Sequence, residues 1–175
     1  LKILYLAKIL LDNTDDNHDI TLQEIIDKLS ANNVTAERKS LYDDIARLDE
    51  FGIKIKKTQY GKTYHYQVVK RDFELAELKL LVDSVAAAKF ITEEKSNKLI
   101  KKIEHLTSKY NATMLQRQVY VSGRVKSMNN GIMENVDAIH TAIAENSKIS
   151  FQYFQWNVKK EPELKRDGKR YEVSP

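Results

Sequence analysis

Residues 34–68 decide the fold of this chain and read VTAERKSLYDDIARLDEFGIKIKKTQYGKTYHYQV. In the first half of this stretch, apolar residues recur every three or four positions, namely Leu41, Ile45 and Leu48. This spacing predicts a helix over about 36–50, with Val34 as an apolar staple and Thr35 as the N-cap before it. Gly52 provides a natural C-terminal stop for this helix.

The second half of the stretch alternates between apolar and polar residues. Isoleucine alternates with lysine after Gly52, and tyrosine or valine alternates with polar residues from Tyr64 onward. The sequence Gln59-Tyr60-Gly61-Lys62 separates the two runs and is typical of a tight turn. The pattern predicts a β-hairpin over 53–68 that carries several lysines.

Two further helices are predicted before this stretch. The first has an apolar face made by Ile3, Leu4, Ala7, Leu10 and Leu11. The polar stretch Asp12–Asp19 ends it, and we interpret that stretch as a solvated loop because it lacks the glycine and the glutamate of a calcium loop. Thr21-Leu22-Gln23-Glu24 has the pattern of a capping box and opens the second helix. Three short helices and a basic hairpin predict a winged helix-turn-helix domain over 1–70.

The outward face of the third helix has the chemistry of a DNA-reading surface. Arginine can bind guanine with two hydrogen bonds, while lysine, serine and tyrosine reach phosphates or base edges. The residues predicted to contact duplex DNA from this helix and its start are Thr35, Arg38, Lys39, Ser40 and Tyr42, with Thr21 and Gln23 holding phosphate at the second helix and Lys54, Lys56, Tyr60 and Lys62 on the hairpin. An ordinary amphipathic helix in a protein-interaction module, with the acidic end of this helix as its contact surface, is the alternative.

Charge is distributed in blocks along the chain. Residues 1–51 hold 6 basic and 11 acidic residues, whereas residues 52–70 hold five lysines and no acid. Long-range attraction for a polyanion depends on such clusters, so the hairpin is the expected source of salt-dependent attraction for DNA.

The remainder of the chain divides into two further predicted segments. Residues 71–130 are expected to form a helical connector and dimerisation region, with one helix inside 73–90 and another that opens at Thr92 and extends to Tyr110. The segment 111–127 is compatible with either a helix or an extended strand. Residues 131–175 begin with a helix from 132. A nine-residue aromatic strand over 148–156, turns at 161–162 and 166–169, and a short strand over 170–173 are predicted after it. The overall expectation is an α+β protein that is mainly α.

Two segments carry a resemblance to a known family. Val34-Thr35-Ala36-Glu37-Arg38-Lys39-Ser40-Leu41-Tyr42-Asp43-Asp44-Ile45 resembles the recognition-helix segment of bacterial regulators of the WYL family, matching at Arg38, Tyr42, Asp44 and Ile45. It departs at Lys39 and Ser40, and it has Asp43 where arginine is common, which removes a positive charge from this segment. The segment 132–175 resembles the opening of a WYL domain.

The resemblance also implies a function for the chain and a fold for its C-terminal segment. It implies a transcriptional regulator in which the C-terminal segment forms the first strands of an Sm-like barrel that senses an effector. The absence of cysteine fits a reducing compartment, so a cytoplasmic, nucleoid-associated protein is expected. A homodimer is expected because one small module rarely provides enough specific contacts to DNA. A small anionic or nucleotide-like effector would meet Tyr153, Arg166, Lys169 and Arg170. A further alternative is an RNA or single-strand binder that acts through the Sm-like portion, with the aromatic strand and a second basic cluster over 159–170 as its contact surface.

Several classes of protein are disfavoured by composition. The 175 residues include no cysteine, which removes disulfides, thiolate catalysis and cysteine-ligated zinc. The four histidines are scattered, so no metal site is expected. No glycine-rich phosphate loop, serine nucleophile elbow or paired-carboxylate pattern occurs, and we therefore expect neither an enzyme nor a bound cofactor. No apolar run approaches the roughly 20 residues that cross a bilayer.

The resemblance also implies self-association through residues 148–173. In the WYL family, the barrel continues beyond the segment that matches Val173-Ser174-Pro175, so an unpaired strand edge and an open apolar face are expected here. Such an edge tends to pair with another chain. We expect light scattering to show a species larger than the monomer as concentration rises, and a monomer at high concentration would contradict this prediction.

Overall fold

The computed structural model describes residues 1–119, 126 and 131–175. The chain is an α+β protein, mainly helical, with seven α-helices and small antiparallel sheets in these described ranges. It divides into two compact units, one formed by residues 1–89 with 93–126 and the other by 90–92 with 127–175. Among the described residues, no helix is both long and apolar enough to cross a membrane.

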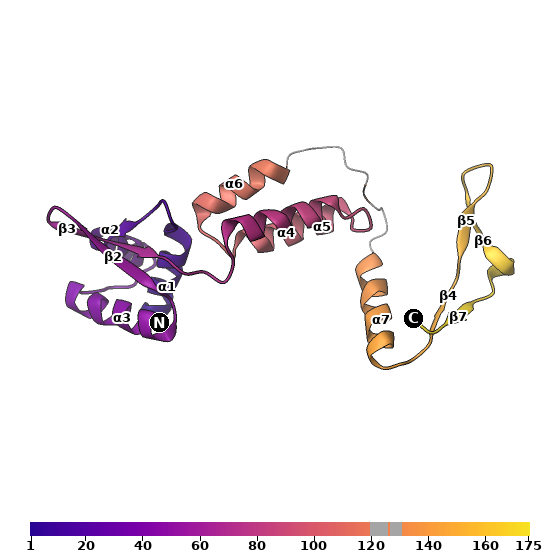
Figure 1. Cartoon of the computed structure of the whole chain (residues 1–175), viewed down its shortest axis with the longest axis horizontal. Helices are drawn as coiled ribbons and strands as arrows, with labels where there is room; N and C mark the ends of the chain where they lie inside the picture. Colours follow the sequence, from indigo (N-terminus) through magenta and orange to yellow (C-terminus); the bar gives the residue numbers. More distant parts are fainter. Residues whose placement is uncertain (120–125, 127–130) are drawn as a thin grey trace. The chain divides into compact units, whose positions relative to one another are not determined.

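The first part of the first unit combines three helices and a three-stranded sheet (Figure 1). Its elements are α1 (Lys2–Asn13), β1 (Ile20–Thr21), α2 (Leu22–Ala31), α3 (Arg38–Phe51), β2 (Ile55–Tyr60) and β3 (Thr63–Val68). The strands are antiparallel in the order β1-β3-β2. Leucine and isoleucine side chains of the helices pack with Tyr66 and Val68 of the sheet into one buried core.

Local signals in the sequence set the ends of these elements. The predicted capping box is confirmed, because the Glu24 amide donates to the Thr21 hydroxyl at 3.3 Å and the Thr21 amide donates to the Glu24 carboxylate at 2.8 Å. Gly52 ends α3 with φ of 118°, which L side chains rarely adopt. The hairpin closes through a two-residue turn in which Gly61 has φ of 59° and Tyr60 pairs with Thr63.

Two local predictions are corrected in this part of the chain. The third helix starts at Arg38 with Glu37 as its N-cap, so Thr35 is not the cap, and the helix spans 38–51 instead of about 36–50. Val34 and Ala36 are instead partly buried against the core. The strand β1 was not predicted, since two residues are too few to show an alternating pattern.

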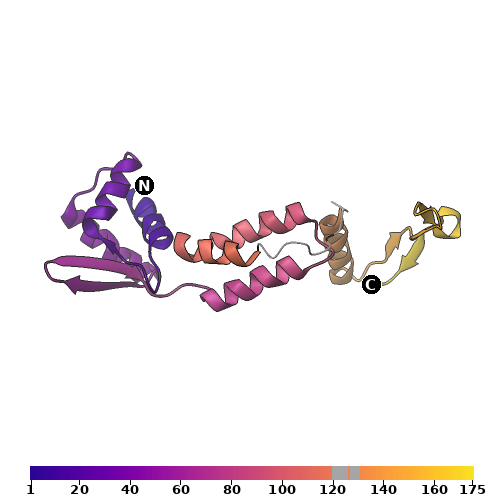
Figure 2. The same ribbon diagram turned by 90° about the horizontal axis from the view of Figure 1, so that it is seen from above.

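The second part of the first unit is a group of three helices. They are α4 (Leu75–Ala87), α5 (Glu93–Glu104) and α6 (Lys109–Val119), and they share a core of Leu78, Val82, Ile100, Ile103 and Leu115. They lie side by side in both ribbon views (Figure 2).

The helix that was expected to extend to Tyr110 ends at Glu104, and a new helix begins at Lys109 because the Ser108 hydroxyl accepts the Asn111 amide at 3.1 Å. The ambiguous segment 111–127 is helical as far as Val119. Apart from Lys126, its remaining residues lie outside the described residues.

The second unit holds one helix and two separate strand pairs. Its elements are α7 (Ile132–Ala144), β4 (Ile149–Phe151), β5 (Phe154–Trp156), β6 (Pro162–Leu164), a 3-10 turn (Lys165–Gly168) and β7 (Tyr171–Val173). β4 pairs with β7 and β5 pairs with β6, both antiparallel, and the described strands form no closed barrel.

Two predictions for this second unit are wrong. The expected nine-residue strand over 148–156 is divided at Gln152 and Tyr153, and its two halves pair with different partners. The expected turn at 161–162 is instead the start of β6, where Pro162 occupies a first-strand position that tolerates proline. The aromatic residues of these strands are exposed, with Trp156 66% exposed.

Replacing Gly52 with alanine should destabilise the protein by about 1–2 kcal/mol, because alanine is strained at this positive φ. The added Cβ would meet nothing within 4 Å, so no steric clash contributes to the loss. Urea unfolding followed by circular dichroism measures this difference. Gly61→Asn is the control, since asparagine tolerates φ near 59° and a small change is expected. If both variants lose the same free energy of unfolding, the loss in Gly52→Ala does not come from the positive φ of Gly52.

Candidate nucleic-acid interface

Helix α3 has one buried side and one exposed side. Leu41, Asp44, Ile45 and Leu48 are buried on the core side. The exposed side carries Arg38, Lys39, Tyr42, Asp43, Ala46 and Arg47. Sequence reasoning missed Arg47, although it stands two helical turns after Lys39 and the period alone could have found it. Glu50 is exposed on this side as well, so the exposed side presents three basic residues and two acids.

One acidic residue of α3, Asp44, is paired on the core side of the helix. The Lys2 ammonium of α1 lies 2.7 Å from the Asp44 carboxylate, and it also donates to the Ser40 hydroxyl. Ser40 is therefore half-buried toward α1 and is not grouped with Arg38, Lys39 and Tyr42. The sequence had counted Asp44 as part of an acidic end of α3, but its charge is neutralised on the core side.

The start of α3 is connected to the start of α2. The Arg38 guanidinium donates to the Gln23 amide oxygen at 3.2 Å, and Gln23 donates to Asp27 at 3.0 Å. The structure thus brings two of the predicted contact residues together, while Thr35 and Lys39 stand exposed nearby in the chain.

Thr21 was expected to bind phosphate, but its hydrogen-bond donors are already used within the protein. Its backbone amide and its hydroxyl both donate to the Glu24 carboxylate, at 2.8 Å and 2.7 Å. These hydrogen bonds, the backbone one first, lower the pKa of Glu24, so a carboxylate occupies the start of α2. A phosphate at this position would meet that negative charge.

The lysines of the hairpin differ in their surroundings. Lys54 is paired with Asp49, Nζ to Oδ2 at 3.2 Å, and the Ile55 amide donates to the same carboxylate at 3.0 Å. The Ile55 hydrogen bond and then Lys54 lower the pKa of Asp49. Lys54 therefore fixes the junction of α3 and β2, whereas three other predicted residues are exposed, namely Lys56, Tyr60 and Lys62.

Lys57 joins the hairpin to α3 and was not among the predicted contact residues. Its ammonium lies 4.0 Å from the ring centroid of Tyr64 and 5.3 Å from that of Tyr42. Because Lys57 pairs with Tyr66 in the ladder, Tyr64 is its diagonal neighbour across the hairpin. The alternation of the hairpin could have placed Lys57 beside Tyr64, but the contact with Tyr42 depends on tertiary packing.

The acidic loop after α1 is exposed at Asp16, Asn17 and Asp19, as predicted, but two of its residues are buried. Thr14 is fully buried and Asp15 is 3% exposed. The Asp15 carboxylate accepts hydrogen bonds from the Ser108 hydroxyl, from His18 Nδ1 at 2.7 Å and from the Asn17 amide at 3.0 Å. Burial raises the pKa of Asp15, but these hydrogen bonds together hold it below its ordinary value.

Further contacts attach the start of α6 to this loop. The His18 ring stacks on the Tyr110 ring with centroids 3.7 Å apart, and Lys109 Nζ donates to Asn13 Oδ1 at 2.8 Å. Arg71, which follows β3, donates to the backbone carbonyl of Leu11 at 2.7 Å. The loop is therefore the joint between the three-helix part and α4–α6.

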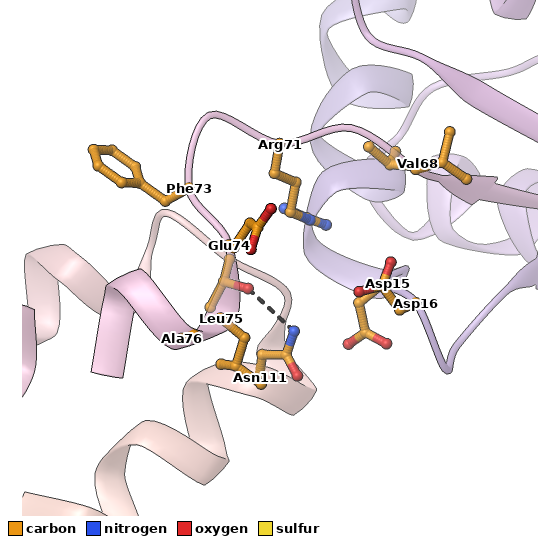
Figure 3. A pocket seen from close by; sticks show the side chains of 11 residues that line it. Asp15, Asp16, Val68, Arg71, Phe73, Glu74, Leu75, Ala76 and Asn111 are labelled. Atoms are coloured by element: carbon orange, nitrogen blue, oxygen red, sulfur yellow. Dashed lines mark hydrogen bonds between the residues drawn. The ribbon is translucent and has the colours of Figure 1, made fainter. Parts of the chain in front are cut away.

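A pocket of about 500 Å³ lies beside this joint (Figure 3). Asp15, Asp16 and Glu74 line it together with the Arg71 guanidinium, and Phe73 and Leu75 add apolar surface. Burial lowers the pKa of Arg71, while the nearby aspartates oppose that effect. Three carboxylates against one guanidinium make this pocket unsuited to an anion.

The residues proposed from the family resemblance to meet an effector all lie in the second unit. The Lys165 ammonium lies 4.9 Å from the Tyr153 ring, and the Arg166 guanidinium lies 4.6 Å from the Tyr171 ring. Arg170 donates to the Ser150 hydroxyl at 2.9 Å. Lys169 is exposed.

Comparison with known proteins gives no further assignment: no family model, no curated protein and no solved structure matches the chain. Within the described ranges, no group of three histidine or acidic side chains is placed to hold a metal ion.

Replacing Asp15 with asparagine should destabilise the protein by about 1–3 kcal/mol, because the hydrogen bonds to a charged acceptor are lost. Since the folded-state pKa lies below the ordinary value of 3.8, this stabilisation is complete above that pH and is lost as the pH falls through the folded-state pKa. The difference between wild type and variant should therefore shrink below about pH 4.

Urea unfolding between pH 7 and pH 2 measures the effect. Asp16→Asn is the matched control, because Asp16 is exposed and adjacent in the chain. A constant difference between wild type and Asp15→Asn across this range would contradict the assignment.

Proposed function

We propose that the chain is a transcriptional regulator that binds duplex DNA through a winged helix-turn-helix. In this proposal α3 enters the major groove and the β2–β3 hairpin contacts the backbone beside it. The observation that carries the proposal is the exposed side of α3, where Arg38, Lys39 and Tyr42 stand opposite the buried stripe.

The order of elements supports this reading. A winged helix needs three helices, a hairpin after the third helix, and a sheet that fixes the hairpin against them. Here β1, between α1 and α2, pairs with β3, so the hairpin is anchored at its C-terminal strand.

The electrostatics of the same surface also support it. Residues 52–70 contain no acid, and Lys56, Lys57 and Lys62 are exposed on the hairpin. Two acids of α3 are neutralised by Lys2 and Lys54, which leaves Asp43 and Glu50 as its exposed unpaired carboxylates among the described residues. The surface is therefore more compatible with a polyanion than the sequence count suggests.

The rest of the chain supplies the regulatory part of the proposal. Homodimerisation through α4–α6 would give two recognition helices, and Leu80 and Leu81 of α4 are exposed apolar residues for that contact. In line with the family resemblance, an anionic effector would bind the second unit near Arg166 and Lys169. Its binding would change the spacing of the two recognition helices.

A specific observation favours one competing function, binding of single-stranded nucleic acid through the second unit. Phe154 and Trp156 of β5 are 51% and 66% exposed, and lysines follow at 159 and 160. Bases stack on such aromatic surfaces without strict sequence preference. Duplex and single-stranded ligands must therefore be compared directly.

Arg38→Ala should weaken binding of selected duplex fragments by about 10- to 100-fold, because one base contact is worth roughly 1–3 kcal/mol. Fluorescence anisotropy with duplex DNA, single-stranded DNA and RNA at two salt concentrations measures this. Lys8→Ala, on the exposed side of α1, is the charge-matched control and should behave as wild type. Preference for single strands, or equal duplex binding by Arg38→Ala and wild type, would count against the proposal.

A further inference from the structure

A groove of about 530 Å³ separates the exposed side of α3 from the hairpin. Its polar lining comes from three tyrosines, one lysine and one aspartate, namely Tyr42, Tyr64, Tyr66, Lys57 and Asp49, and Ile45 and Ile55 form part of its apolar lining. Apart from Tyr42, none of these side chains was predicted to contact a ligand. The groove therefore gathers four hydrogen-bond donors beside an apolar surface.

The charge of Lys57 is not neutralised inside this groove. The ammonium is held over the rings of Tyr64 and Tyr42, which attract a cation but carry no charge. Asp49 is the one carboxylate among the described residues that line the groove, and it already accepts Lys54 and the Ile55 amide. A positive charge is thus held in place without an acidic partner.

The hydroxyl of Tyr66 provides a second and independent observation. Tyr66 is 1% exposed, and its buried hydroxyl has no hydrogen-bond partner. Burial, followed by the neighbouring Tyr42 and Tyr64, raises the pKa of Tyr66 to about 12, so the group stays a proton donor. A buried donor without an acceptor is destabilising, and an incoming acceptor oxygen would satisfy it.

We propose that this groove binds one nucleotide, with a phosphate oxygen accepting from Lys57 and Tyr66 and the sugar against Ile45 and Ile55. A bare phosphate fills only a small part of such a volume, which is why the ligand includes the attached nucleoside. The phosphate comes either from a DNA strand, in which case the inference rests on the proposed function, or from a free nucleotide.

The test uses thymidine 3′,5′-bisphosphate as the probe and the full chain as the protein, with binding measured by calorimetry. Lys57→Gln and Tyr66→Phe should each lower the affinity about fivefold or more, because the first removes the positive charge that faces the phosphate and the second removes a hydrogen-bond donor to a charged acceptor. Lys8→Gln is the control and should bind as wild type. Tyr66→Phe should keep or raise the melting temperature of the free protein, which a purely structural hydroxyl would not do.

A second arm measures duplex binding against salt. If the phosphate belongs to a DNA strand, Lys57→Gln lowers the slope of log affinity against log salt by about 1. If bisphosphate binding depends on Lys57 and Tyr66 while the salt slope of duplex binding is unchanged, the groove binds a free nucleotide. Absence of bisphosphate binding together with an unchanged slope overturns the inference, even if the duplex is bound. If no duplex is bound at all, the proposed function fails and the bisphosphate still decides the groove.

Discussion

The buried carboxylate of Asp15 is the contact on which the first unit depends. It lies between two parts of the chain that are far apart in sequence, since its Ser108 partner is separated from it by 93 positions. A buried charge is tolerated only when its hydrogen bonds are made, and here a hydroxyl, an imidazole and a backbone amide all meet it. The start of α6 is consequently fixed against the loop that follows α1, and the stacked rings of His18 and Tyr110 extend the same contact.

Two acidic residues of α3 are likewise paired with lysines. Its core side uses Asp44 to hold Lys2, and its C-terminal end uses Asp49 to hold Lys54 and the first amide of β2. These pairs connect α1 and the hairpin to α3, beside the hydrophobic core that the three elements share. They also remove negative charge from the helix, so that its structural contacts and its proposed DNA-binding surface reinforce one another.

Sequence reasoning succeeded where the signal is local. The capping box at Thr21, the stop at Gly52 and the turn at Gly61 each depend on neighbours within a few residues, and all three are confirmed. It failed where partners are distant: Asp15 was taken as solvated because Ser108 cannot be seen from the loop. The strand over 148–156 was taken as continuous because the change of partner at Gln152 depends on β6 and β7. For the candidate interface, the exposed side of α3 followed from helical periodicity, whereas the pairing of Lys54 and the position of Lys57 needed the tertiary structure.

The joint at Asp15 also determines how this protein can be divided. A fragment that stops after the hairpin would contain every residue of the three-helix part but would lose Ser108 and Tyr110. Asp15 and His18 would then face water in place of their partners, although the segment itself contains a complete core. The segment that folds as one unit is therefore longer than the three helices and the hairpin of the motif. The helices α4–α6 belong to the scaffold of the candidate DNA-binding part as much as to any connector.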